Sequence, residues 1–274
     1  DRINQMNNLY YCETIESTNP CGEQPLPPYG ACLLGSFNLV RYVKNGKDWS
    51  RFDWDLLKKD IPDVVRAMDN VIDSTIYPLK EQEVEAKNKR RMGLGITGLA
   101  NAGEMMGYSY ASDQFIRLQK KVLKMIRDET YLTSSSLARE KGSFPLYDKE
   151  KYLEGRFIKT LSPYVLESIK KNGMRNSHLT SIAPTGTISL SADNVSSGIE
   201  PPFSHFYDRT LRTFEGDRVE RVEDYAYARG VKGKTSEDIS AAQHVDILLT
   251  SQKYVDSACS KTCNIGDDVT FDKF

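Results

Sequence analysis

The sequence has few of the residues that bind zinc, since its 274 residues include only three histidines and five cysteines. His178, His205 and His244 show no zinc-ligand spacing with the cysteines or with one another. An odd number of cysteines in a chain of this length also argues against a disulfide framework and favours a reducing compartment. We therefore expect no metal site.

A large charge of one sign and long apolar runs are also missing. The net charge is −1 at pH 7, which gives no electrostatic reason to expect nucleic acid or an anionic membrane as a partner. No apolar run approaches the roughly 20 residues of a membrane span, and no signal-like segment opens the chain. The composition predicts a cytoplasmic protein with no direct nucleic-acid partner and no membrane contact.

One stretch, residues 17–38, carries the groups that point to chemistry. Its prolines remove backbone donors and fix φ, so the segment cannot be a helix. Every second residue from 19 to 23 is polar or reactive, namely Asn19, Cys21 and Glu23. If the backbone there is extended, these three side chains point to the same side. The pattern predicts a stiff loop that holds a reaction centre.

Strands are expected on both sides of this loop, and helices follow. Residues 3–12 end in a short apolar run, Leu9 to Cys12, and residues 33–43 read as a buried strand that closes at a turn, Asn45-Gly46. Helical spacing of apolar residues and capping signals predict helices over 53–74 (with a kink at Pro62), 81–91, 113–141, 163–172 and 236–257. Further strands are predicted over 179–183 and 206–214. This alternation predicts an α/β fold.

Two stretches raise the question of nucleotide binding. Gly93, Gly95 and Gly98 match G-x-G-x-x-G, but a polar, basic helix precedes them and no acidic residue follows about 20 positions later. Close helix packing permitted by glycine is therefore favoured over a dinucleotide site. Within the helix predicted over 236–257, His244 is interpreted as a structural histidine whose hydrogen bonds are satisfied.

The second stretch is Pro184-Thr185-Gly186-Thr187-Ile188-Ser189, directly after the strand predicted over 179–183. A turn of small residues that opens a helix presents free backbone N–H groups to a phosphate. It lacks the lysine of a Walker motif, so ATP hydrolysis is not supported. From the residues alone, an anion-binding turn and an ordinary capped helix both stay open.

Several collinear motifs together resemble the catalytic subunit of ribonucleotide reductase. They are NPCGEQPL (19–26), APTGTIS (183–189), SGIEP (197–201), QKYVDSA (252–258) and SKT (260–262), and they extend over nearly the whole chain. The resemblance implies an α/β fold that is part of a ten-stranded α/β barrel with a finger loop through its centre. The stretch around Cys21 matches that finger loop.

The resemblance also implies roles for individual residues. Cys21 would become a transient thiyl radical that removes the ribose 3′ hydrogen, because an S–H bond is close in strength to a ribose C–H bond. Glu23 would be the base on the 3′ hydroxyl, Asn19 would hydrogen-bond the ribose hydroxyls, and Cys32 would be one of two reducing thiols. The backbone of Pro184, Thr185, Gly186, Thr187, Ile188 and Ser189 would hold the phosphates of a ribonucleoside di- or triphosphate.

The subclass that the chain resembles is the adenosylcobalamin-dependent class II, rather than the iron-dependent class I. Only eleven positions separate Cys21 from Cys32, and the Gly-Glu-Gln-Pro-Leu run and the Ser-Lys-Thr run resemble class II sequences. The implied cofactor is adenosylcobalamin. The implied electron source is a thiol reductant of the thioredoxin-like kind.

The chain also departs from the family's pattern. No segment corresponds to the second reducing cysteine, to the specificity loop or to the allosteric site, all of which precede the finger loop in the family. We expect residues 1–274 to be the C-terminal part of the catalytic barrel domain, either excised from a longer chain or one half of a split enzyme that a complementary N-terminal polypeptide completes. Cys12, Cys259 and Cys263 receive no role. Two alternatives stay open: an inactive nucleotide-binding or assembly module of the same fold, and a nicotinamide-dependent oxidoreductase based on Gly93.

Overall fold

A parallel sheet forms the centre of the fold in the computed structural model, which describes residues 2–44, 51–214, 216–265 and 270. Strands β3 (Leu33–Asn38) and β4 (Met92–Thr97) pair in parallel. Two extended segments continue the sheet beyond β4 through parallel bridges, first residues 178–182 and then residues 257–260. Every residue of β4 is buried, as expected for an inner strand of a parallel sheet.

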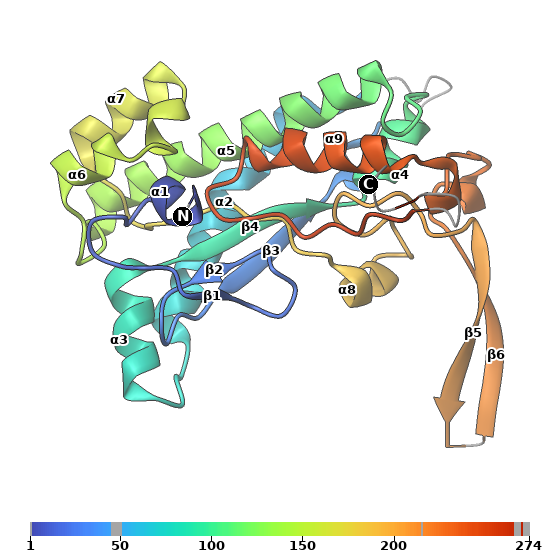
Figure 1. The fold of residues 1–274 in the computed structure, drawn as a ribbon, viewed down its shortest axis with the longest axis horizontal. Helices are drawn as coiled ribbons and strands as arrows, with labels where there is room; N and C mark the ends of the chain where they lie inside the picture. The colour runs from blue at the N-terminus through green and yellow to red at the C-terminus, as the bar shows by residue number, and fades with distance from the viewer. Residues whose placement is uncertain (1, 45–50, 215, 266–269, 271–274) are drawn as a thin grey trace.

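Four helices lie together along one side of this sheet (Figure 1). Helix α2 contacts both β3 and β4, and helix α5 packs on the other three helices. The four are α2 (Trp54–Ser74), α5 (Asp113–Lys141), α7 (Pro163–Asn172) and α9 (Ala241–Gln252). The smaller elements are α1 (Arg2–Met6), α3 (Lys80–Lys89), α4 (Leu99–Met105), α6 (Lys149–Glu154), α8 (Gly186–Ser191), β1 (Ser17–Thr18), β2 (Pro25–Leu26), β5 (Phe206–Thr213) and β6 (Gly216–Glu223).

The helices predicted over 53–74, 81–91, 113–141 and 163–172 are confirmed within a few residues. Local signals set their ends: the Ser112 hydroxyl accepts a hydrogen bond from the first turn of α5, and α7 begins with proline and ends before Gly173, which has φ +81°. Helix α2 continues through Pro62. The mixed helix and strand content confirms the α/β class, whereas the ten-stranded barrel stays a prediction.

Two predictions around the sheet are wrong. The run from Leu9 to Cys12 is not a strand but a turn after α1. It contains apolar residues because a turn can also supply the core, and Leu9 is fully buried. The strand predicted over 33–43 ends at Asn38, whose side chain accepts a hydrogen bond from the Val40 N–H and so caps a 3-10 helix, Leu39–Tyr42. The turn predicted at Asn45-Gly46 lies outside the described residues.

The C-terminal half differs from the predictions in two further places. The helix predicted from residue 236 begins only at Ala241, because Thr235 and Asp238 form a capping box around a separate 3-10 turn, Ser236–Asp238. The strand predicted over 206–214 is confirmed as β5. Its antiparallel partner β6 was missed, because its sequence GDRVERVE is mostly charged. The two strands form a ribbon that projects from the rest of the structure (Figure 1).

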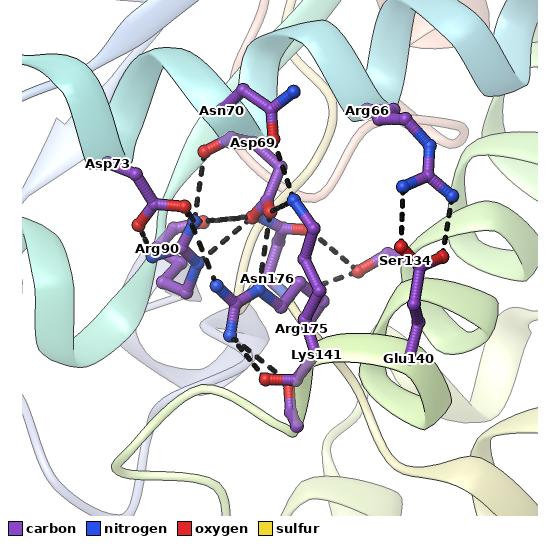
Figure 2. Close-up of polar contacts among 11 residues, drawn as sticks. Arg66, Asp69, Asn70, Asp73, Arg90, Ser134, Glu140, Lys141, Arg175 and Asn176 are labelled. Carbon is purple, nitrogen blue, oxygen red and sulfur yellow. Dashed lines mark hydrogen bonds and ion pairs between the residues drawn. The ribbon is translucent and has the colours of Figure 1, made fainter.

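A buried ionic network ties α2 to the start of β4 (Figure 2). Asp69 of α2 is fully buried, and its carboxylate accepts hydrogen bonds from Arg90, Arg175 and Asn176. Lys141, at the end of α5, lies 3.4 Å from the same carboxylate. One acid therefore joins four separate parts of the chain behind the sheet.

Gly93 and Gly95 of the G-x-G-x-x-G pattern lie in strand β4, so the prediction that these glycines allow close helix packing is wrong about the element; Gly98 follows the strand and is the N-cap of α4. They do allow a close approach: a Cβ added at Gly95 would lie 2.2 Å from the backbone oxygen of Ser181. Residues 178–182 hydrogen-bond to β4 there, so neither backbone can move aside. Glycine is required for the sheet to form.

Alanine at Gly95 is therefore expected to destabilise the protein by about 3 kcal/mol, the upper end of overpacking effects, because the clash is with backbone. Urea unfolding would measure it. Alanine at Gly35 of the neighbouring strand is the matched control, since its added Cβ would meet the flexible end of Met68 at 3.0 Å. Equal losses for the two variants would contradict the backbone explanation.

Candidate active site

Residues 19–24 form the tight turn of a hairpin. Strands β1 and β2 pair antiparallel, with Thr18 opposite Pro25. The Asn19 N–H donates to the Gln24 carbonyl at 3.1 Å, and the Asn19 side-chain oxygen accepts the Gln24 N–H at 3.0 Å. Gly22 has φ +81°. The extended backbone that would point all three side chains to one side is not found, because the Asn19 side chain bonds to backbone and Gly22 allows the reversal.

This turn places the three predicted site residues in different environments. Cys21 is exposed at the tip, Asn19 is half-buried, and Glu23 is only 1% exposed. The Oε2 atom of Glu23 has no hydrogen-bond partner among the described residues. The backbone oxygen of Glu23, in contrast, accepts the Ala258 N–H at 3.0 Å. The structure thus fixes the backbone of Glu23 and leaves one buried carboxylate oxygen free to react.

Cys32 directly precedes β3 and is half-buried. Burial raises the pKa of its thiol to about 12; the positive charge of Arg91 opposes the rise, and the carboxylates of Glu23 and Asp256 add to it. Cys32 therefore stays a thiol at neutral pH and lies within electrostatic reach of Glu23. A protonated thiol is the form that can donate a hydrogen atom.

Two site residues were missed at the sequence level, Gln24 and Ser181. Both are buried, and neither the Gln24 amide nor the Ser181 hydroxyl has a hydrogen-bond partner within the described part of the chain. They converge on Gly93, where an added Cβ would lie 2.1 Å from Gln24 Nε2 and 2.3 Å from Ser181 Oγ. Buried polar groups are rarely left unpaired, so this cluster marks a place for bound water or ligand. The only sequence signal for this cluster was that Gln24 directly follows Glu23.

A charged cluster anchors the base of the hairpin. Arg91 donates to the Pro25 backbone oxygen at 3.2 Å and to both carboxylate oxygens of Glu13. Burial alone would raise the pKa of Glu13, but the positive charges of Arg91 and Lys89 outweigh it and hold that pKa at about 2. Glu13 is therefore ionised at any physiological pH, and the hairpin stays tied to the residues that precede β4.

The predicted anion-binding turn opens the short helix α8. Its N-cap Thr185 has φ +53°, and no side chain caps the helix. The Thr185 hydroxyl accepts the Gly198 N–H at 2.8 Å, and the Ser189 hydroxyl donates to the Gly186 oxygen, so both hydroxyls are used internally. A Cβ added at Gly186 would meet no atom of the described residues within 4 Å. The backbone amides of 186–188, rather than the hydroxyls, are available to an anion. The other residues predicted to bind phosphate are Pro184, Thr187 and Ile188, of which Thr187 and Ile188 are exposed.

The comparisons with known proteins agree with these motifs. Residues 1–274 match the family described as the ribonucleotide reductase barrel domain. The chain belongs to this family. The resemblance drawn from the motifs around Cys21 and Thr185 is therefore confirmed.

The relatives include B12-dependent reductases and subunits named alpha. The vitamin B12-dependent ribonucleoside-diphosphate reductase of Mycobacterium tuberculosis (strain CDC 1551 / Oshkosh) is 34% identical over 300 residues, which cover 99% of this chain and 40% of the relative. That of Thermoplasma acidophilum is 34% identical, covering 98% of the chain and 36% of the relative. The ribonucleoside-diphosphate reductase subunit alpha of Chlamydia pneumoniae is 30% identical over 76% of the chain and 22% of the relative. The chain thus spans about two fifths of the B12-dependent relatives.

Two further observations concern groups outside the hairpin of this barrel-domain chain. His244 is 1% exposed, and neither ring nitrogen has a partner among the residues that the structure describes, so the prediction of a satisfied histidine is wrong. Burial lowers its pKa to about 4, with the charge of Lys261 adding to the effect.

Within residues 2–44, 51–214, 216–265 and 270, no three His, Cys, Asp or Glu side chains gather to hold a metal ion. No helix in those ranges is long and apolar enough to span a bilayer.

Proposed function

We propose that this chain carries the reaction centre of a cytoplasmic ribonucleotide reductase, which reduces ribonucleoside di- or triphosphates to 2′-deoxyribonucleotides. The observation that carries the proposal is the hairpin formed by β1, β2 and the turn between them. There an exposed thiol, Cys21, lies two residues from the buried carboxylate of Glu23, one oxygen of which has no hydrogen-bond partner among the described residues. Membership of the family gives this pair a reaction to perform.

In the proposed reaction each group has one task. Cys21, as a thiyl radical, takes the hydrogen atom from C3′ of the ribose, and Oε2 of Glu23 accepts the proton of the 3′ hydroxyl. Asn19 uses its side-chain oxygen on the Gln24 N–H, which leaves its Nδ2 group to donate to the ribose hydroxyls. The fixed hairpin holds these groups in register with the sugar.

The reduction itself needs two thiols. The 2′ hydroxyl leaves as water, and Cys32 and a second cysteine together supply two hydrogen atoms and become a disulfide. We propose that the second cysteine comes from a complementary N-terminal polypeptide. A thiol reductant, a thioredoxin-like protein in the cell, then restores both thiols. The thiol form of Cys32 at neutral pH suits this role.

We further propose that residues 1–274 form the C-terminal part of a ten-stranded α/β barrel and that the turn from Pro184 to Ser189 binds the substrate phosphates. The open space at Gly186 and the uncapped start of α8 support the phosphate role. The match of residues 1–274 to the barrel-domain family supports the barrel.

Adenosylcobalamin is the proposed radical source. B12-dependent relatives match 98–99% of the chain, whereas the alpha subunit of Chlamydia pneumoniae matches 76%. When bound, this cofactor supplies a carbon-centred radical that can take a hydrogen atom from a thiol. The chain's own residues fit such a reactant at one place, because Cys21 is exposed and a Cβ added at Gly22 would meet nothing within 4 Å.

A reconstitution assay tests the function. The chain would be combined with the N-terminal part of a B12-dependent relative, adenosylcobalamin and a dithiol, and deoxynucleotide formation followed with CDP and with CTP separately. Turnover with either substrate is the expected result. Nucleotide binding without turnover would instead favour an inactive binding module and would contradict the proposal.

Glutamine at Glu23 is expected to lower turnover by roughly 10²- to 10⁴-fold, the range for loss of a general base, because an amide cannot accept the 3′ proton. Nucleotide affinity should change little, since the phosphates are bound elsewhere. Steady-state kinetics would separate the two effects. The control is glutamine at Glu16, an exposed carboxylate in the same segment, and a similar loss in both variants would contradict the role of Glu23.

A further inference from the structure

Asp256 belongs to the QKYVDSA motif, to which the proposed reaction assigns no role. It is 7% exposed. Its Oδ2 accepts the Leu179 N–H at 2.7 Å and the Tyr131 hydroxyl at 2.6 Å, and its Oδ1 accepts the Thr180 N–H at 3.0 Å. No ion pair of Asp256 is found among the described residues, so neutral donors alone stabilise this carboxylate.

These bonds hold residues 256–258 against residues 179–182. The Asp256 N–H donates to the Thr180 hydroxyl at 3.0 Å, and the Ser257 N–H donates to the Thr180 oxygen at 3.1 Å. The next amide, Ala258 N–H, is the group that binds the backbone oxygen of Glu23. The Asp256 side chain therefore determines where the Ala258 N–H, which binds the backbone oxygen of Glu23, lies.

Asp256 also acts on Cys32 through its charge. Burial raises the pKa of Asp256 to about 6, against the hydrogen bonds from Tyr131, Thr180 and Leu179, so the group is mostly ionised at neutral pH. The charged groups that act on the Cys32 thiol are Arg91, Glu23 and Asp256, and the two carboxylates favour the protonated thiol. Asp256 thus acts on both Glu23 and Cys32.

We propose that Asp256 is a positioning residue of the reaction centre, which fixes the backbone of Glu23 through Ala258 and supplies a negative charge that acts on the Cys32 thiol. The inference rests on the proposed roles of Glu23 and Cys32. It extends them to a residue that contacts neither side chain directly.

Asparagine at Asp256 tests the proposal, because it keeps the size of the side chain, removes the charge and turns an NH2 group toward one of the backbone donors. Hydrogen exchange at the Ala258 amide should become about tenfold faster, since the weakened clamp leaves that amide more open. Alkylation of Cys32 at pH 8.5 should become roughly three- to tenfold faster, since a thiolate forms more readily without the neighbouring charge. Both are measured on the full chain, with its complementary polypeptide present, by peptide mass spectrometry.

Two more variants separate positioning from general loosening. Phenylalanine at Tyr131 removes one donor to Asp256 but keeps the charge, so exchange at Ala258 should rise while alkylation of Cys32 stays unchanged. Valine at Thr130 is the matched control and should change neither readout, because this buried hydroxyl on the same helix has no partner within the described residues.

Wild-type exchange at Ala258, or wild-type alkylation of Cys32, in folded Asp256→Asn would overturn the proposal. Alkylation of the half-buried Cys259 rising in parallel would also overturn it, because a loosened sheet would then explain the result. If Asp256→Asn does not fold, Tyr131→Phe decides, and wild-type exchange at Ala258 would count against the clamp. Neither readout needs turnover, so a failed reductase assay would reject the proposed function without affecting this test.

Discussion

Serine in place of Cys21 is expected to reduce deoxynucleotide formation to background. A serine O–H bond is much stronger than a ribose C–H bond, so the oxygen cannot exchange a hydrogen atom reversibly with the sugar. The fold should tolerate the change, because Cys21 is exposed and the hairpin is closed by the backbone and the Asn19 side chain. The reconstituted assay with CDP and CTP would measure the loss, and circular dichroism would check the fold.

Serine at Cys12 is the matched control for this prediction. Cys12 is also exposed and precedes the same hairpin, but neither the family motifs nor the hydrogen bonds give it a part in the reaction. Its variant should keep wild-type turnover. Comparable turnover in the Cys21 and Cys12 variants would show that the radical chemistry does not pass through Cys21.

The helices were predictable because their ends are set by neighbouring residues. Helix α5 was expected at its observed bounds from its apolar spacing and from Gly142, a local stop signal, and the structure adds Ser112 as an equally local start signal. The errors arose where distant segments decide. Strand β4 looked like helix packing because Gly95 is explained only by the backbone of Ser181, a residue far away in the sequence that lies against β4 in the fold.

The site was predictable in its residues but not in its geometry. The motif around Cys21 identified the thiol, the carboxylate and the amide, yet the assumption of an extended strand missed the turn that exposes Cys21 and buries Glu23. The partners of the site, Ser181 and Asp256, come from segments whose sequence signals are those of ordinary strand and helix-end residues. Only the three-dimensional fold brings them to the hairpin.

The ionic network behind the sheet leads to the largest expected effect on stability (Figure 2). Arg90 is 4% exposed and donates to Asp69 Oδ1 from Nε at 2.9 Å and from Nη2 at 2.7 Å. Its remaining acid partner, Asp73, is half-exposed. A buried guanidinium that loses its buried acid keeps its desolvation cost without the attraction that offsets it.

Asparagine at Asp69 is therefore expected to lower the free energy of unfolding by about 3–5 kcal/mol, the range for breaking a buried ion pair by removing one partner. The neutral amide cannot balance Arg90, Arg175 and Lys141, and its NH2 group would face their donors. The loss should also reach the active site, because Arg90 directly precedes Arg91, which anchors the hairpin at Pro25. Urea unfolding and hydrogen exchange of residues 19–26 would measure the two consequences.

The same pair of helices offers a matched control. Arg66 of α2 and Glu140 of α5 form a bidentate pair at 2.8 and 2.6 Å, with side chains that are about half exposed. Glutamine at Glu140 should leave the stability almost unchanged, because water already solvates both charges and screens their attraction. Equal destabilisation by the two acid-to-amide changes would mean that burial does not decide the strength of the pairs. A large loss of stability for Asp69→Asn alone would show that the fold around the active-site hairpin depends on the charges buried between α2 and the start of β4.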